Sequence, residues 1–162
     1  MERMVRNVKH LSQLLESRHW KLATAESCTG GLIAAACTDM PGASAWFERG
    51  FVTYSNESKM EMLGVSAKTL EEQGAVSQAV AHAMAQGALS RSQAQVAIAV
   101  TGIAGPSGGK DHKPVGTVWF GLAVNDKGMI RVETTQRQFP GDRAAIREAS
   151  VGFAIALVLS LI

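Results

Sequence analysis

A hydroxyl, a thiol and a second hydroxyl stand side by side in the segment AESCTGG at residues 25–31. An apolar run at 20–25 precedes them and predicts a strand, and an alanine-rich run at 32–37 predicts a helix. Ser27 is therefore expected at a strand-to-helix bend, where backbone N–H groups lack intrahelical partners. Such groups would bind a phosphate or stabilise the oxyanion that forms when a serine attacks a carbonyl. Simple helix capping by Ser and Thr is a third interpretation, and all three stay open at this point.

A serine nucleophile needs a base, and the segment FVTYSNESK at residues 51–59 supplies a phenol, Tyr54, and an amine, Lys59. The four histidines suggest no Ser-His-Asp arrangement and are predicted at surface positions. A lysine can take the proton instead if burial or a neighbouring cation lowers its pKa from about 10.4 toward neutrality. The competing interpretation of Lys59 is an ordinary exposed residue of a helix.

Cys28 is an alternative nucleophile, because a thiol at a helix N-terminus can have a lowered pKa and attack as a thiolate. The competing interpretation is a small side chain packed beneath the turn, which the frequent burial of free cysteines favours. The second cysteine, Cys37, lies nine residues further along the same turn and helix. That spacing separates the two by roughly 13 Å, so no disulfide is predicted between them.

The composition excludes several classes of protein. The chain has 162 residues, of which 46% are hydrophobic and 19% charged, and this predicts a single domain over residues 1–162. A net charge of +2 with scattered basic residues argues against a nucleic-acid partner. Too few Cys and His residues are present for a zinc site, and no metal, no cofactor and a cytoplasmic location are expected. The apolar run at 151–162 is shorter than the roughly 20 residues of a membrane span, so it predicts a buried helix or a homodimer contact.

The order of elements predicts an α/β fold, a three-layer α/β/α sandwich with a mixed, mostly parallel five-stranded sheet. The first helix should pack on the sheet through Val5, Val8, Leu11, Leu14 and Leu15. In such folds ligands collect at the carboxyl ends of the strands, where Ser27, Tyr54 and Thr101 would share a cleft. Helices are predicted at residues 3–17, 31–38, 56–63, 67–73, 77–90 and from Asp142 to the end, and strands at 20–25, 46–54, 95–100, 115–125 and 129–138.

A second glycine-rich segment, TGIAGPSGGK at residues 101–110, matches no standard phosphate-binding motif. The Walker pattern would need a glycine where Ala104 stands and Ser or Thr where Asp111 stands. The dinucleotide fingerprint and the G-x-S-x-G elbow are also missing from the sequence. The sequence therefore predicts neither an NTPase, nor a dinucleotide-dependent enzyme, nor a standard α/β-hydrolase.

Five segments taken together closely resemble the CinA C-terminal domain family, and the resemblance spans nearly the whole chain. The length is similar to that of its stand-alone members, which deamidate nicotinamide mononucleotide. The resemblance implies hydrolysis of that carboxamide to nicotinate mononucleotide and ammonia, in pyridine-nucleotide salvage. The segments are AESCTGG at 25–31, GFVTYSN at 50–56 with Lys59, GAVS at 74–77, TGIAGP at 101–106 and KPVGTVW at 113–119.

Carried onto matching positions, the resemblance implies a serine-lysine mechanism that uses no metal. Ser27 would be the nucleophile, Lys59 the base, and Tyr54 a hydrogen-bonding partner that orients the lysine or relays the proton. The backbone of Cys28, Thr29, Gly30 and Gly31 is expected around the oxyanion. Glycine-rich backbone and a guanidinium suit a phosphate, so Thr101, Gly102, Gly105 and Arg143 are expected to bind the nucleotide.

Two alternatives stay open at this stage. One is a catalytically silent nucleotide-binding or protein-interaction domain, since the family is also linked to competence and DNA damage. The other keeps the amide chemistry and changes the substrate to another amide-bearing nucleotide or a free amide.

Overall fold

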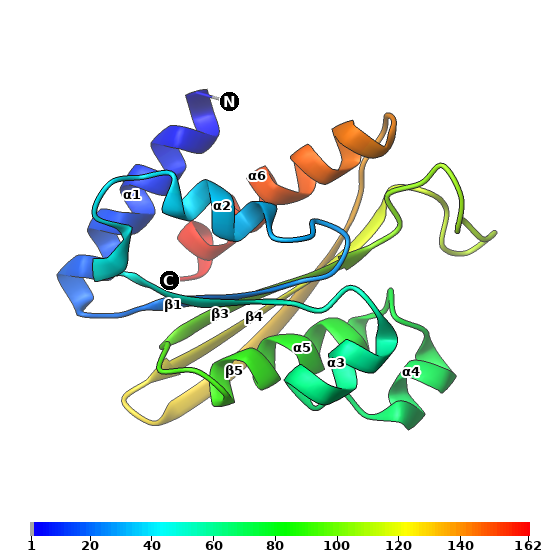
Figure 1. Cartoon of the computed structure of the whole chain (residues 1–162), viewed down its shortest axis with the longest axis horizontal. Helices are drawn as coiled ribbons and strands as arrows, with labels where there is room; N and C mark the ends of the chain where they lie inside the picture. Colours follow the sequence, from blue (N-terminus) through cyan, green and yellow to red (C-terminus); the bar gives the residue numbers. More distant parts are fainter. Residues whose placement is uncertain (1) are drawn as a thin grey trace.

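The computed structural model describes residues 2–162 as a five-stranded sheet with helices on both faces (Figure 1). The strands lie in the order β2-β1-β3-β4-β5. The predicted α/β/α sandwich is confirmed. The strands are β1 (Leu22–Glu26), β2 (Phe47–Val52), β3 (Val96–Gly102), β4 (Thr117–Asp126) and β5 (Met129–Gln138).

The sheet is mixed because one strand runs against the others. β1 pairs in parallel with both β2 and β3, whereas β4 pairs antiparallel with both β3 and β5. Hence β1, β2, β3 and β5 share one direction and β4 alone is reversed, which confirms the prediction of a mixed, mostly parallel sheet. The carboxyl ends of β1, β2 and β3 consequently meet at one edge.

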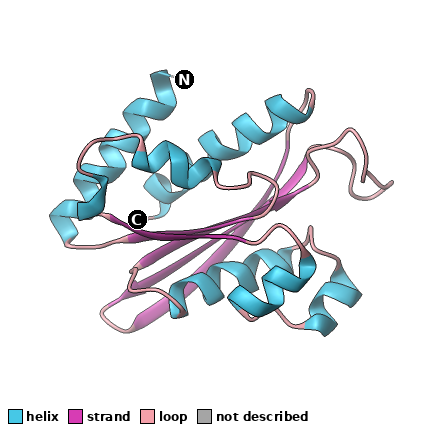
Figure 2. Ribbon diagram, in the orientation of Figure 1, coloured by secondary structure: helices cyan, strands magenta, loops and turns pink. Residues whose placement is uncertain are grey.

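Three helices cover each face of the sheet (Figure 2). All six lie close to their predicted positions, and Ser77 and Asp142 cap α5 and α6 as expected. A short 3-10 helix between α2 and β2, Ala43–Ala45, was not predicted. One face carries α1 (Glu2–Arg18), α2 (Leu32–Thr38) and α6 (Arg143–Leu161), and the other α3 (Asn56–Leu63), α4 (Ala67–Gln73) and α5 (Gln78–Ser90).

The two faces of the central strands differ in side-chain size, because alternate residues point to opposite sides. Large side chains face α1, α2 and α6, while alanines face α5. The small residues let α5 approach closely: a Cβ at Gly121 of β4 would lie 2.3 Å from the Ala81 carbonyl oxygen. The large residues of β1 and β3 are Leu22, Val96, Ile98 and Val100, and the small ones are Ala23, Ala25, Ala97 and Ala99.

The first helix packs in part as predicted. Val8, Leu11 and Leu15 are buried, but Val5 is 57% exposed. The helix lies chiefly against α6 rather than on the sheet. Val8, Leu11 and Leu15 nevertheless belong to the same buried cluster as Leu22 and Val96 of the sheet.

By length and composition alone, α6 is long and apolar enough to cross a membrane. A helix in the core of a soluble protein passes the same test, so this property is weak evidence of a span. One side of α6, which includes Ile146, Val151 and Ile155, is buried in the core shared with α1 and the sheet. This packing accounts for part of the apolar character of the helix.

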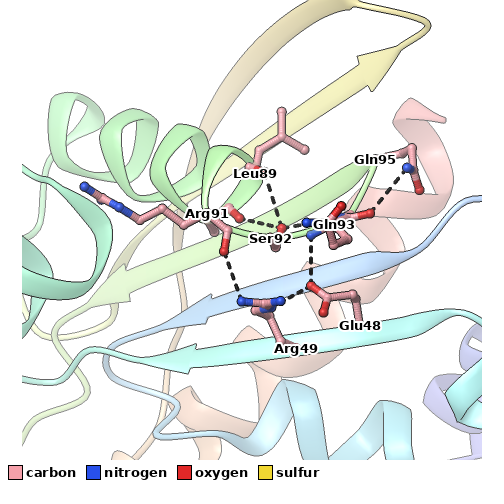
Figure 3. A network of polar contacts seen from close by, with 9 residues as sticks. Glu48, Arg49, Leu89, Arg91, Ser92, Gln93 and Gln95 are labelled. Atoms are coloured by element: carbon pink, nitrogen blue, oxygen red, sulfur yellow. Dashed lines mark hydrogen bonds and ion pairs between the residues drawn. The ribbon is translucent and has the colours of Figure 1, made fainter.

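A network of polar contacts lies near the amino-terminal ends of the parallel strands, at the edge opposite their carboxyl ends (Figure 3). The Glu48 carboxylate of β2 accepts hydrogen bonds from Arg49 Nε at 2.7 Å and from the Gln93 amide at 3.1 Å. Arg49 also donates to the Arg91 carbonyl at 3.2 Å. The network ties edge strand β2 to the loop between α5 and β3 and leaves the carboxyl edge free for a site.

Candidate active site

Ser27 is the first residue beyond β1, and its side chain faces the α3 and α5 side of the sheet. Its amide continues the strand pairing by donating to the Val100 carbonyl at 3.0 Å. Ala23 and Ala25 point to that same side, and strand alternation places Ser27 with them. The residue is 8% exposed. The hydroxyl is thus held at the carboxyl edge on a rigid strand end.

Lys59 reaches this hydroxyl from the opposite side of the cleft. It lies on α3, whose first turn is capped by the Ser55 hydroxyl, which accepts a hydrogen bond from the Ser58 amide. Although it is a lysine, it is only 1% exposed. Its Nζ lies 3.0 Å from Ser27 Oγ and 3.1 Å from the Tyr54 carbonyl oxygen. The hydroxyl and the amine that the sequence predicted to converge are therefore in direct contact.

Burial lowers the pKa of the Lys59 amine from its ordinary value. Both of its hydrogen-bond partners are uncharged oxygens, so no carboxylate holds the ammonium form in place. Removal from water disfavours the charged form, which increases the share of free amine near neutrality. This is the condition under which a lysine can act as a base.

Tyr54 contacts Lys59 through its main chain rather than its phenol. The Tyr54 side chain is 62% exposed, and its hydroxyl accepts a hydrogen bond from Arg143 Nη2 at 3.2 Å. The lysine is oriented by a carbonyl that any residue at position 54 would supply. The phenol and the Arg143 guanidinium instead meet at the mouth of the cleft.

A cleft of about 300 Å³ opens at this edge of the sheet. Besides Ser27, Lys59 and Tyr54, it contains five of the residues expected to bind substrate: Cys28, Thr101, Gly102, Gly105 and Arg143. Seven further residues line the cleft that were not expected from the sequence to bind substrate: Asn56, Ala75, Val76, Ile103, Ala104, Ser107 and Gly108. No group of three or more Cys, His, Asp or Glu side chains able to hold a metal occurs in residues 2–162.

Thr101 and Arg143 secure the walls of the cleft. The Thr101 hydroxyl donates to the Ala75 carbonyl at 2.9 Å and so joins β3 to the segment before α5. Arg143 Nη1 donates to the Gly105 carbonyl at 2.8 Å, in addition to the contact with Tyr54. Arg143 therefore bridges the second glycine-rich loop and the segment that follows β2.

Thr29, Gly30 and Gly31, whose backbone was also expected around the oxyanion, are not among the residues that line the cleft. The Thr29 hydroxyl is fully buried and donates to Glu26 Oε1 at 2.6 Å. The Gly30 amide donates back to the Ser27 carbonyl at 3.1 Å and closes the turn. The Thr29 hydroxyl and the Gly30 amide thus shape the turn beneath Ser27.

Glu26 explains that arrangement, and its role was not anticipated. It is 1% exposed, and its carboxylate accepts from the Ile33 amide at 2.8 Å and the Ala34 amide at 3.0 Å as well as from Thr29. The N-cap residue of α2 supplies no side-chain bond, so Glu26 caps that helix from the strand end. An acidic residue inside an apolar strand run was the available signal, because glutamate is buried only when its charge is satisfied.

Arg147 is a second residue that sequence reasoning missed. It lies one turn after Arg143 on α6 and donates to the carbonyls of Cys28 at 3.0 Å and Thr29 at 3.4 Å. The four-residue spacing places the two arginines on one face of the helix and was the available signal. The turn after Ser27 is thus contacted by Glu26 on one side and by Arg147 on the other.

Cys28 has the environment of a packed thiol rather than a reactive one. It is 6% exposed and belongs to the core beneath α2 and α6. Burial is the main cause that raises the pKa of its thiol to about 11, so the thiol is neutral near pH 7. These properties favour a side chain packed beneath the turn over a thiolate nucleophile.

Fold and site together define a three-layer α/β protein with a polar cleft at the carboxyl edge of its parallel strands, where a serine hydroxyl meets a buried lysine. The CinA C-terminal domain family model matches residues 5–162. The chain belongs to the CinA C-terminal domain family.

Similar proteins of known name share most of the chain. A protein of Enterobacter agglomerans named nicotinamide-nucleotide amidohydrolase PncC is 56% identical over 90% of this chain and 87% of its own length. The protein of the same name from Escherichia coli K12 is 49% identical over 91% of this chain and 87% of its own. The crystal structure of the competence/damage inducible protein CihA from Agrobacterium tumefaciens superposes with a TM-score of 0.91 at 43% identity, and covers 98% of this chain and 95% of that one.

Proposed function

We propose that this chain hydrolyses the carboxamide of nicotinamide mononucleotide to nicotinate mononucleotide and ammonia, with Ser27 as nucleophile and Lys59 as base. The observation that carries the proposal is the 3.0 Å contact between a buried lysine amine and a serine hydroxyl inside the cleft. The names of the two similar amidohydrolases supply the reaction and the class of substrate.

The first step forms an acyl-enzyme. Uncharged Lys59 accepts the Ser27 hydroxyl proton along the 3.0 Å line while Ser27 Oγ attacks the carboxamide carbon. The negative charge that develops on the carboxamide oxygen is stabilised by backbone N–H groups of the turn after Ser27. The resulting Lys59 ammonium then gives its proton to the amide nitrogen, the carbon-nitrogen bond breaks, and ammonia leaves.

The second step releases the product. A water molecule attacks the ester carbon of the acyl-enzyme, and Lys59 takes a proton from that water. When the ester bond breaks, the proton returns to Ser27 Oγ, and the pyridine carboxylic acid departs. Lysine suits this cycle because burial lowers its pKa, so the amine that starts the reaction is regenerated uncharged.

The nucleotide part of the substrate would lie along the second glycine-rich loop. Thr101, Gly102 and Gly105 line the cleft there, and the exposed Arg143 guanidinium supplies positive charge at its mouth. Arg143 would meet the phosphate, since a guanidinium binds phosphate oxygens through paired hydrogen bonds. The mechanism assigns no role to a metal or a cofactor.

A cytoplasmic location and a homodimer also belong to this proposal. The two buried cysteines are both free thiols, which suits a reducing compartment. The partly buried apolar residues of α6 supply the surface that a second copy of the chain would contact.

Ammonia release by purified protein tests the proposal. We expect turnover with nicotinamide mononucleotide and much lower turnover with free nicotinamide and nicotinamide riboside, because both lack the phosphate that Arg143 would bind. Equal turnover of all three would move the substrate class away from nucleotides. Nucleotide binding without ammonia release would favour a catalytically silent binding domain.

A further inference from the structure

The turn that carries Ser27 is held from outside by an arginine of α6. Arg147 Nε donates to the Cys28 carbonyl at 3.0 Å, and its Nη2 donates to the Thr29 carbonyl at 3.4 Å. Arg147 is half-buried and does not line the cleft. Within the described chain it forms no ion pair. The contacts of its guanidinium are therefore made to these two main-chain oxygens.

A carbonyl that is held in place fixes the amide next to it. The peptide bond is planar and trans, so the C=O of one residue and the N–H of the next point in opposite directions. The Cys28 carbonyl points to Arg147, and the Thr29 N–H consequently points away from the guanidinium. Rotation of this peptide unit by half a turn would replace the Thr29 N–H with a carbonyl oxygen and would break the bond to Arg147.

Most amide donors near Ser27 are already occupied. The Gly30 N–H donates to the Ser27 carbonyl, and the Leu32 N–H donates to the Thr29 carbonyl. The next two amides of α2, those of Ile33 and Ala34, donate to Glu26. In the described part of the chain, the amides of Cys28, Thr29 and Gly31 donate to no acceptor of another residue. Of these, the N–H groups of Cys28 and Thr29 lie nearest to Ser27 along the chain and are the candidates to stabilise an oxyanion beside it.

We propose that Arg147 is a positioning residue for the hydrolysis: by locking the Cys28–Thr29 peptide it holds the Thr29 N–H toward the oxygen of the reacting carboxamide, beside the N–H of Cys28. This inference rests on the proposed function. A donor aimed at an oxyanion acts mainly in the transition state, so misaligning it lowers kcat rather than weakening substrate binding.

Steady-state kinetics test the effect on the reaction. We expect Arg147→Ala to lower kcat by about 10- to 100-fold, with KM changed by less than about threefold, since removing a whole oxyanion donor costs on the order of 10²–10³. Arg147→Lys should lose less kcat than Arg147→Ala, because an ammonium is still a charged donor. It should not match wild type, because a point charge does not reproduce the two-pronged guanidinium. Methylguanidinium added to Arg147→Ala should restore part of kcat, which a purely structural defect would not allow.

Arg137→Met provides a matched control. Arg137 also lies against α6, with its guanidinium carbon 4.7 Å from the Phe153 ring centre, but it has no atom in the cleft. We expect wild-type kcat and KM in this variant. An unchanged kcat in Arg147→Ala, or a loss confined to KM, would overturn the proposal. If Arg147→Ala does not fold, the comparison of Arg147→Lys with wild type decides by the same criterion.

A crystal structure of Arg147→Ala, or of Arg147→Lys if the first does not fold, tests the inference without turnover. We expect the Cys28–Thr29 peptide to rotate or to occupy two orientations. A peptide in its original orientation would overturn the inference. The failure of the proposed function would look different: wild-type protein would release no ammonia, whatever the variant shows for the peptide.

Discussion

The two glycine-rich segments of the chain both reach the cleft, but they are built in opposite ways. In the first, residues 27–31, the Ser27, Cys28 and Thr29 positions are buried, and the turn is fastened to β3, Glu26 and α6. In the second, residues 102–110, the stretch 106–110 is exposed to solvent. Under the proposed function, this difference means that the first segment would fix the reacting atoms and the second would contact the rest of the substrate.

The largest expected effect comes from removing the proposed nucleophile in the buried segment. Ser27→Ala should lower kcat by about 10⁴- to 10⁶-fold, because the covalent step is lost. Cys28→Ala, one residue along the same turn, should keep kcat within a few-fold, since its thiol is neutral and packed. Ammonia release by both variants measures this. The reverse result, with Cys28→Ala inactive and Ser27→Ala active, would make Cys28 the nucleophile.

Removing the Lys59 amine should have the next largest effect on turnover. Lys59→Met should lower kcat by about 10²- to 10⁴-fold, the usual contribution of a general base. In wild type, kcat/KM should rise with pH through the lowered pKa of Lys59, because only the uncharged amine accepts a proton. The variant should lack that rise. A pH profile that is the same in both proteins would remove Lys59 from the mechanism.

The buried Lys59 should also make the stability of the folded protein depend on pH in a defined direction. Its pKa is lower in the folded state than the value of about 10.4 in the unfolded chain, so between the two values the unfolded chain binds more protons. Wild-type stability due to this group therefore rises with pH over that window, and below it the full penalty remains. Lys59→Met should lack this rise in urea denaturation series, and its advantage over wild type should shrink toward pH 10.

Changing the Glu26 carboxylate beneath the turn should have a smaller effect, and this effect is on stability. Glu26→Gln keeps the size of the side chain but sets an NH2 group against donors that now meet a carboxylate oxygen, namely Thr29, Ile33 or Ala34. We expect a loss of about 1–3 kcal/mol in the free energy of unfolding. Urea denaturation measures it, with Glu57→Gln on the exposed first turn of α3 as the control. Unchanged stability would show that this cap is dispensable.

The smallest effect should come from the exposed segment. Gly108 has a φ of +94°, a backbone conformation that L side chains rarely adopt. Gly108→Ala should lower the free energy of unfolding by about 1 kcal/mol. It should raise KM a few-fold with kcat nearly unchanged, because the reacting groups lie on the other segment. A fall in kcat comparable to that of Lys59→Met would contradict the division between the two segments.

Much of the fold followed from periodicity and turn residues, and these are local properties. The helices over 56–63, 67–73 and 77–90 and the hairpin around Lys127 and Gly128 lie where the sequence predicted them. The packing of α1 on α6 was not predicted, because an apolar helix face does not specify its partner. The meeting of Ser27 with Lys59 followed only from combining the resemblance with the rule that parallel strands present their carboxyl ends together.

The roles of Glu26 and Arg147 could not be obtained from residue types alone. Each acts on backbone groups, and every residue carries the same backbone groups. The Tyr54 interaction shows the same limit, since the sequence suggested the phenol whereas the carbonyl contacts the lysine. Which atoms of a turn remain unpaired depends on how distant elements meet, and no short motif encodes that.

The reversal of β4 has a consequence for how the segment 103–116 can change over time. β4 runs antiparallel to β3, so the chain leaves the sheet at Gly102 and re-enters at Thr117 on the same edge. Two hydrogen bonds hold the ends of this segment together. The Ile103 amide donates to the Thr117 carbonyl at 2.9 Å, and the Gly116 amide donates to the Ile103 carbonyl at 2.8 Å. Insertions or deletions between Ile103 and Gly116 would leave the strand register intact. Under the proposed function, evolution could therefore change the part of the cleft that contacts the nucleotide without disturbing the Ser27 hydroxyl and the Lys59 amine.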